Sequence, residues 1–320
     1  MTNIVKPNSA NIQKAAQIIK DGGLVAFPTE TVYGLGANVY NAKAVAAIFA
    51  AKGRPTFNPL ISHIAEIDFL KEYVETDERS LELARHFWPG PFTMILKRKE
   101  YNPGIDLACA GLPNASVRMP NHPIALDLIR LSGVPIVAPS ANRSQTISPT
   151  TAQHVADGLG DEVDMILDGG QCPIGVESTI VDVTGKDVVL LRAGGIPLED
   201  IEQFLNEKVI ISNGEAGRPS SPGQVLNHYI PKHKFEINVT DPEDGVFYIG
   251  FGNSKRADLN LSPSGNLREA AANLFTCMRL ADEKAGEKGI AVAPIPEQGL
   301  GLAINDRIRK AANVKRPNAD

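Results

Sequence analysis

The sequence contains few cysteines and no long apolar run. Its 320 residues include three cysteines, Cys109, Cys172 and Cys277, which are widely separated and form no C-x-x-C pair. This pattern speaks against a disulfide framework and against a cysteine zinc site. The opening stretch, MTNIVKPNSA, carries no apolar signal core, and no apolar run reaches the roughly 18 residues of a membrane span. We therefore expect a cytoplasmic protein that does not cross a membrane.

Several standard signatures of ligand and catalytic sites are also missing. No G-x-x-x-x-G-K-[ST] loop is present, YGLGANVYN does not fit G-x-G-x-x-G, and neither GVEST nor PSANR fits G-x-S-x-G. The six histidines show no H-x-x-x-H spacing, so we expect no metal site built from protein side chains. The net charge of −5 disfavours a protein that holds nucleic acid chiefly by neutralising phosphates.

The remaining composition is that of a globular protein, with 43% hydrophobic and 22% charged residues. This length suits two domains of roughly 100–200 residues each. Strand-like apolar runs occur at 24–28, 59–64, 92–98, 116–119, 134–139, 163–168, 178–183 and 188–192. Helical patterns occur at 10–20, 41–53, 77–87, 121–132, 151–158 and 197–206. The irregular alternation predicts an α/β domain with a mixed sheet and flanking helices.

The composition changes near residue 212. The stretch SNGEAGRPSSPGQ is dense in Ser, Gly and Pro, which is typical of linkers. We therefore predict a catalytic domain over 1–212, a linker over 213–232 and a small C-terminal α/β domain over 233–320. For the last domain we expect three layers, with strands at 235–239, 245–252 and 290–295 and helices at 266–286 and 301–312.

The stretch KGRPTFNPL (52–60) raises a question about function. Lys52 and Gly53 are ordinary at a helix end, because cations suit the negative C-terminus and glycine suits the left-handed cap. Arg54 and Asn58 have no such explanation. We expect Arg54 on an exposed loop that binds an anion, where its removal would leave the fold intact.

Other polar side chains follow predicted strands, where α/β enzymes commonly bind ligands. The clearest are Thr31 after 24–28, Ser140 and Asn142 after 134–139, Arg118 inside the strand 116–119, and Arg192 at the end of 188–192. Each is also typical of a turn or a surface ion pair, and His63, between apolar neighbours, is also typical of a core histidine. These residues indicate an anion-binding α/β enzyme without identifying its reaction.

Eight motifs occur in a characteristic order: FPTETVYGLG, KGRPTFNPL, HFWPGPFTMIL, SVRMPNHP, PSANRS, SPT, DGGQCPIGVESTIVD and LRAGGI. This series resembles the YrdC-like threonylcarbamoyl-AMP synthases. The later stretches SPGQVLNHYIPKH and GLGLAINDRIRKAA resemble the longer, two-domain form of the family. The resemblance implies a YrdC-like domain with a mixed twisted sheet and flanking helices, then a linker and a small Rossmann-like α/β domain.

The resemblance also implies a reaction. L-threonine, bicarbonate or CO2, and ATP would give L-threonylcarbamoyladenylate and pyrophosphate, a nucleotidyltransferase chemistry, with Mg²⁺ carried on the ATP phosphates. A transfer complex would then use the product to modify tRNA next to the anticodon, and transient tRNA contact is compatible with this role. The alternative is an RNA-binding or ribosome-associated YrdC-like module.

Carried over motif by motif, the resemblance implies roles for individual residues. The signature tetrad around the triphosphate would be Lys52, Arg54, Ser140 and Asn142. Further ATP contacts would come from Asn58, Asn114, Ser148, Arg192 and His228. The threonine site would comprise Thr31, His63, Arg118, Ala138 (through its backbone) and Ser178, with the Arg118 fork matched to the threonine carboxylate.

The stretch SPGQVLNHYIPKH is unusual for a linker. His228 and Tyr229 lie between Pro222 and Pro231, and polar aromatic groups in such a segment can dock against a surface. They could anchor the second domain, or they could cover the nucleotide as a lid. The resemblance favours the lid, with His228 in contact with ATP.

Overall fold

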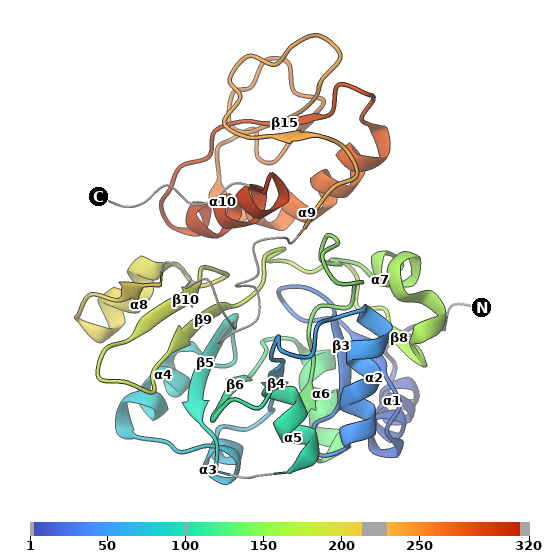
Figure 1. Ribbon diagram of the computed structural model, residues 1–320, viewed down its shortest axis with the longest axis vertical. Coiled ribbons are helices and arrows are strands. Elements are labelled where there is room, and N and C mark those ends of the chain that lie inside the picture. The colour runs from blue at the N-terminus through green and yellow to red at the C-terminus, as the bar shows by residue number, and fades with distance from the viewer. Residues whose placement is uncertain (1–2, 100–101, 213–228, 314–320) are drawn as a thin grey trace.

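The computed structural model describes residues 3–99, 102–212 and 229–313, which form two domains (Figure 1). In the first domain, an 11-stranded sheet has the order β1-β8-β2-β3-β7-β4-β6-β5-β9-β10-β11. Its strands are β1 (Ile4–Val5), β2 (Val25–Phe27), β3 (Gly34–Asn38), β4 (Ile61–His63), β5 (Phe92–Lys97), β6 (Asn114–Arg118), β7 (Ile136–Val137), β8 (Met165–Leu167), β9 (Thr179–Asp182), β10 (Val189–Arg192) and β11 (Ile210–Ile211). Parallel and antiparallel neighbours both occur in the sheet, so the predicted mixed sheet is confirmed.

Helices cover both faces of this sheet. They are α1 (Ser9–Asp21), α2 (Ala42–Lys52), α3 (Leu70–Tyr73), α4 (Glu78–Phe87), α5 (Pro103–Ala108), α6 (Pro123–Ser132), α7 (Ala152–Leu159) and α8 (Leu198–Leu205), with short 3-10 turns at Ile67–Phe69 and Gly160–Glu162. Buried residues of α1 and α6 share one cluster with Val25 and Phe27. Buried residues of α2, α4, α5, α7 and α8 pack in a second cluster with Leu24 and Ala26. This alternation along β2 is the period of two that a sheet buried on both faces requires.

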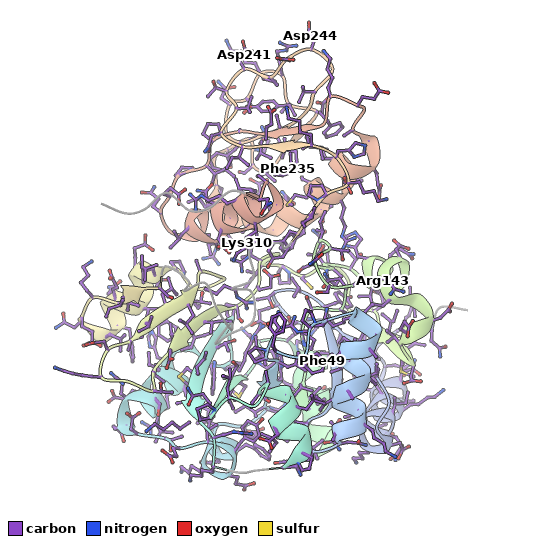
Figure 2. The ribbon with its side chains drawn as sticks, viewed as in Figure 1. Phe49, Arg143, Phe235, Asp241, Asp244 and Lys310 are labelled. Carbon is purple, nitrogen blue, oxygen red and sulfur yellow. The ribbon has the colours of Figure 1, made fainter. Side chains whose placement is uncertain are left out.

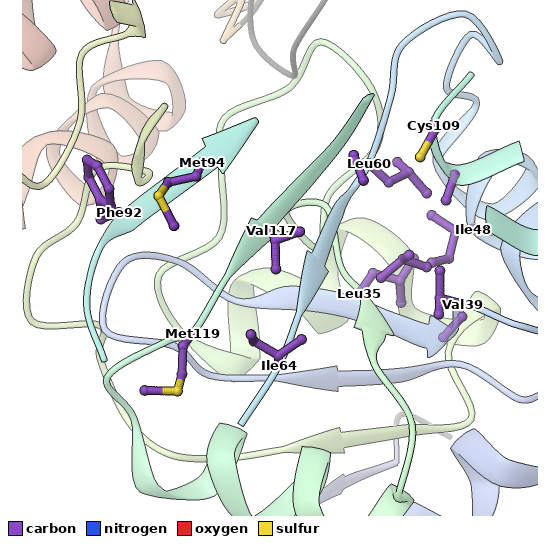
Figure 3. Close-up of a cluster of buried hydrophobic side chains, with 14 of the residues drawn as sticks. Leu35, Val39, Ile48, Leu60, Ile64, Phe92, Met94, Cys109, Val117 and Met119 are labelled. Carbon is purple, nitrogen blue, oxygen red and sulfur yellow. The ribbon is translucent and has the colours of Figure 1, made fainter. Parts of the chain in front are cut away.

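The larger cluster forms the core of the first domain (Figure 3). It joins Ile48 of α2 and Leu35 of β3 to Val117 of β6 and Met94 of β5, all of which are at most 4% exposed. The core therefore ties together the strands whose ends carry the predicted site residues.

The second domain has a four-stranded parallel sheet in the order β12-β15-β13-β14. Its elements are β12 (Phe235–Glu236), β13 (Phe247–Gly250), β14 (Leu259–Asn260), α9 (Leu267–Lys284), β15 (Ile290–Val292) and α10 (Leu300–Ala311). Both helices pack on one face of the sheet, the side toward the first domain in Figure 1. Loop residues, including Val239 and Phe251, cover the other face. The prediction of three layers is therefore wrong for this domain. Among the residues that the structure describes, helices form a layer on one face of the sheet only, and loops cover the face where the third layer would lie.

Most predicted elements are confirmed, but the strand that follows β2 was not predicted. Gly34–Asn38 forms β3, which pairs with β2 and β7. The two glycines of this strand masked its apolar pattern, and a Cβ on Gly36 would lie 2.7 Å from Phe27. Strand β14 was also missed because it is short. Among the described residues, no helix has the length and apolar character needed to cross a bilayer.

The two domains share a packed interface. Val32, Ile147 and Val176 of the first domain belong to one hydrophobic cluster with residues of α9, including Leu274 and Phe275. The helix comes so close that a Cβ on Gly175, whose φ is +76°, would lie 2.4 Å from the Ala271 carbonyl oxygen. This close approach fixes α9 above the loop that leads into β9.

Candidate active site

A pocket opens where strand ends of the first domain meet the interface. It is lined by Thr31, Val32, Arg54, Ile61, His63, Arg118, Ala138, Pro139, Ser140, Glu177, Ser178, Arg192 and Tyr229. Eight of these were predicted as site residues, including all five of the threonine set. Ala138 and Ser140 follow β7, Ser178 precedes β9, and Arg118 and Arg192 end β6 and β10. The sheet thus gathers residues that are far apart in the chain.

The helix before KGRP is defined at both ends. The Asn41 side chain accepts hydrogen bonds from Lys43 N and Ala44 N, and Gly53 forms the C-cap with φ of 58°. Lys52 then turns inward, where its Nζ donates to the carbonyl oxygens of Ser140 and Asn142, each at 2.5 Å. Burial, with a further contribution from Arg54, lowers the pKa of Lys52 well below its usual value. Lys52 thereby connects the KGRP loop to the PSANR loop.

Arg54 is buried, so the expectation of an exposed loop cation is wrong. Its Nε donates to Asn58 O at 3.1 Å and its Nη2 donates to Pro59 O at 2.8 Å, and the residue is 9% exposed. Burial, together with the charge of Arg192, lowers the pKa of Arg54 to about 9. The turn made by Pro55 and Asn58 brings these carbonyls to the guanidinium, which fixes Arg54 in the pocket wall.

Arg192 lies on the other side of the pocket and binds the start of β9. Its Nε and Nη2 donate to Ser178 O at 3.0 and 2.9 Å, and Nη2 also reaches Ser178 Oγ at 3.0 Å. That hydroxyl is 2.7 Å from Thr93 Oγ1. Burial lowers the pKa of Arg192 to about 10, although Glu177 opposes this shift.

Arg118 is held by a carboxylate that sequence reasoning missed. Its Nη2 lies 2.7 Å from Glu30 Oε1, while Nη1 donates to Thr31 Oγ1 at 3.0 Å and Nε donates to Gly90 O at 3.2 Å. Glu30 and Arg118 are both buried. Glu30 stands beside Thr31 in FPTETVYGLG, and a carboxylate next to a predicted site residue was the available signal.

His63 fits both interpretations that the sequence left open, a site residue and a core histidine. It lines the pocket, yet it is 3% exposed, its Nδ1 lies 3.2 Å from Ile61 O, and its ring meets Phe27 edge-on at 6.3 Å. Burial and the neighbouring Arg118 lower the pKa of His63 to about 3. The imidazole is therefore neutral at physiological pH, and it forms an uncharged, hydrogen-bonding part of the pocket lining.

The remaining predicted residues lie around the pocket or away from it. The Oδ1 atoms of Asn58 and Asn142 are buried and have no hydrogen-bond partner among the described residues. Ser148 Oγ donates to Glu177 Oε1 at 2.7 Å. Asn114 begins β6, at the opposite end of the strand from Arg118 and outside the pocket lining. His228 lies outside the described residues, but its neighbour Tyr229 is described and lines the pocket.

Five lining residues were absent from the predicted set, and two of them, Glu177 and Tyr229, carry polar side-chain groups. Glu177 directly precedes Ser178 and accepts hydrogen bonds from Ser148 and Tyr229. Tyr229 is 1% exposed, and its OH lies 2.8 Å from Glu177 Oε1. The position of Glu177 inside the motif DGGQCPIGVESTIVD was a usable signal. The contact with Tyr229 spans 52 positions and could not be inferred from spacing.

The fold and the pocket together define a two-domain α/β protein with a buried, cationic ligand site. Residues 17–194 match the Sua5/YciO/YrdC family, described as "Telomere recombination", and residues 196–313 match the family described as "Threonylcarbamoyl-AMP synthase, C-terminal domain". The chain therefore belongs to the Sua5/YciO/YrdC family, in the form that carries the second domain.

Individual relatives agree with this assignment. The threonylcarbamoyl-AMP synthase of Pyrococcus abyssi (strain GE5 / Orsay) is 43% identical, over 95% of this chain and 94% of its own. That of Bacillus subtilis (strain 168) is 40% identical, over 98% of this chain and 96% of its own. The crystal structure of P. abyssi Sua5 complexed with L-threonine superposes with a TM-score of 0.89 at 40% identity, covering 98% of this chain and 97% of that one.

Proposed function

We propose that this chain makes L-threonylcarbamoyladenylate from L-threonine, bicarbonate or CO2, and ATP, and releases pyrophosphate. The observation that carries the proposal is the convergence of Arg54, Arg118 and Arg192 in one buried pocket, with Lys52 directly behind it. Such a pocket suits a reaction between two anionic partners, a carbamate and a triphosphate. Relatives named for this activity match along almost the whole chain.

In the proposed reaction, the amine of threonine adds to CO2 and loses a proton to give a carbamate. A carbamate oxygen then attacks the α-phosphorus of ATP, and the bond from this phosphorus to the bridging oxygen breaks, so that pyrophosphate leaves. By its chemistry this is a nucleotidyl transfer. Positioning and charge neutralisation supply most of the catalysis in such steps, because no covalent enzyme intermediate is needed.

We assign the triphosphate to the side of the pocket formed by Lys52, Arg54, Ser140 and Asn142. Lys52 holds the Ser140 and Asn142 carbonyls in place. Arg54 lines the pocket, and its guanidinium has more N–H donors than its bonds to Asn58 and Pro59 use. The buried Oδ1 atoms of Asn58 and Asn142 are suited to accept hydrogen bonds from hydroxyl or amino groups of the nucleotide. Ser148, Asn114, Arg192 and His228 remain proposed ATP contacts.

We assign threonine to the side formed by Thr31, His63, Arg118, Ala138 and Ser178. Arg118 would bind the carboxylate, and the neutral imidazole of His63 would accept or donate a hydrogen bond without adding charge. This arrangement separates the amino acid from the triphosphate by the width of the pocket, which leaves the carbamate facing the α-phosphate.

Mg²⁺ is proposed to enter with ATP. Among the described residues, no group of three or more His, Cys, Asp or Glu is placed to hold a metal ion. The pocket carboxylate of Glu177 already accepts from Ser148 and Tyr229 and pairs with Arg307. The phosphate oxygens would therefore be the main ligands, and the ion would offset their charge.

The wider role is also part of the proposal. The catalytic domain would comprise 1–212 and the C-terminal domain 233–320, joined by 213–232, of which 213–228 lie outside the described residues. The product would pass in the cytoplasm to a transfer complex that modifies tRNA next to the anticodon, and transient tRNA contact is part of the proposal.

The proposal can be tested by pyrophosphate release from ATP and bicarbonate, with L-threonine and separately with L-serine. We expect release that requires threonine, with serine at least about tenfold less effective, because the loss of one methyl group from a substrate typically costs about tenfold or more in a fitted pocket. Release without any amino acid, or no release with either one, would exclude the proposed reaction.

A further inference from the structure

The pocket contains one feature that opposes an anionic substrate. Glu177 is the one carboxylate among the described residues that line it, and it shares the wall with Arg54, Arg118 and Arg192. Its side chain is 9% exposed. A buried, uncompensated negative charge at this place would repel a triphosphate and would cost free energy in the empty protein.

Besides Arg192, whose pKa Glu177 raises, a compensating charge comes from the second domain. Arg307 on α10 places Nε 2.9 Å from Glu177 Oε2, and its own side chain is completely buried. Its Nη1 also donates to Ala193 O at 2.6 Å, next to Arg192 in the chain. Glu177 raises the pKa of Arg307 against the effect of burial, so the guanidinium stays charged. One residue of α10 thus contacts two segments that border the pocket.

The other Glu177 oxygen completes the arrangement. Oε1 accepts from Ser148 Oγ at 2.7 Å and from Tyr229 OH at 2.8 Å. The carboxylate is therefore oriented by three groups from three parts of the chain. Figure 2 shows that Lys310, one turn after Arg307 on α10, lies where the second domain meets the first, while Asp241 and Asp244 lie at the far end of the second domain.

We propose that Arg307 is a positioning residue for the ATP site: it neutralises and orients Glu177, so that the pocket keeps its surplus of positive charge. The second domain then takes part in nucleotide binding without touching the nucleotide. This inference rests on the proposed function, because it assumes that the anion in the pocket is ATP.

The plain alternative is that Arg307 only holds the two domains together. The two roles predict different effects for the two single variants Arg307→Gln and Glu177→Gln. If the pair is only a structural link, Arg307→Gln and Glu177→Gln break it equally. If the charge matters, Arg307→Gln leaves the Glu177 carboxylate without this ion pair beside the substrate and Glu177→Gln leaves an extra cation, so their effects on ATP binding differ.

The test is calorimetric titration of the full chain with ATP, followed by pyrophosphate kinetics with threonine and bicarbonate. We expect Arg307→Gln to raise the Kd and KM for ATP about tenfold or more with a smaller change in kcat, and Arg307→Lys to raise them less. Glu177→Gln should leave the Kd within about threefold, and Arg307→Gln/Glu177→Gln should restore it to that range.

Arg309→Gln is the matched control, because Arg309 lies on the same helix and pairs with Glu297 within the second domain. It should leave ATP binding unchanged. If Arg307→Gln does not fold, the double variant still decides, since it removes both charges of the pair, while Asp306, the other carboxylate that Arg307 contacts, keeps its ion pair with Lys310: a tenfold loss of ATP affinity there would overturn the proposal. Equal losses in both single variants, or none in a folded Arg307→Gln, would also overturn it. Failure of the wild type to bind ATP would instead contradict the proposed function.

Discussion

Among the buried cations of the described residues, two sets differ in what holds them. Lys52, Arg54 and Arg192 donate to backbone carbonyl oxygens, and burial lowers the pKa of each. Arg307 pairs with the carboxylate of Glu177, which raises its pKa. Carbonyl dipoles orient a cation without cancelling its charge, whereas a carboxylate cancels it. The first set is therefore available to an anionic substrate, and the second set shapes the pocket.

The largest effect is expected at Arg54, a member of the carbonyl-bound set. Arg54→Ala should lower kcat/KM for pyrophosphate release by about 100-fold or more, because it removes a preorganised donor from the triphosphate side. It should also destabilise the protein by about 1–3 kcal/mol, since the carbonyls of Asn58 and Pro59 lose their buried partner. Activity assays with thermal melts measure both effects. Retained activity would remove Arg54 from the substrate-binding set.

Arg118 sharpens the comparison because it has features of both sets. It pairs with Glu30, yet it lines the pocket. Arg118→Ala should raise the Kd for threonine about tenfold or more and change the Kd for ATP little. Arg118→Lys should recover only part of the loss, since a lysine lacks the two-pronged fork. Calorimetry with each ligand separates the effects, and equal losses for both ligands would contradict the assignment.

His63 gives a smaller effect that depends on pH. Its folded pKa of about 3 lies below the ordinary value of about 6.5, so the unfolded chain binds the extra proton between these limits. The stability that comes from keeping His63 neutral is complete above about pH 6.5 and is lost as the pH falls toward 3. His63→Gln should reduce the slope of unfolding free energy against pH by up to about 1.4 kcal/mol per pH unit between pH 4 and 6. Denaturant unfolding at several pH values measures this slope, and an unchanged slope would mean that His63 is charged or accessible.

The smallest effect is expected for a cation in neither set. Arg256 in the second domain pairs with Asp244 at the surface, and its side chain is 56% exposed. Arg256→Ala should leave ATP binding unchanged and alter stability by less than about 0.5 kcal/mol. A clear loss of activity in this variant would show that charge far from the pocket influences the reaction.

Much of this arrangement could be predicted from the sequence. The strand before Ser140 and the strand after Ser178 follow from short apolar runs, and the helix before KGRP follows from its cap residues. The burial of Arg54 could not be predicted, because it depends on the Asn58 and Pro59 carbonyls turning back. The partners Glu30 and Arg307 could not be predicted either, since their contacts with Arg118 and Glu177 join segments that only the folded chain brings together.

The proposed reaction is tested most directly by following the carbon of bicarbonate. The protein should be incubated with ATP, L-threonine and bicarbonate labelled with heavy carbon, and the adenylate product should be analysed by mass spectrometry. We predict a threonylcarbamoyl adenylate that carries the heavy carbon and that disappears when threonine or ATP is omitted. Pyrophosphate release without such a labelled adenylate would contradict the account.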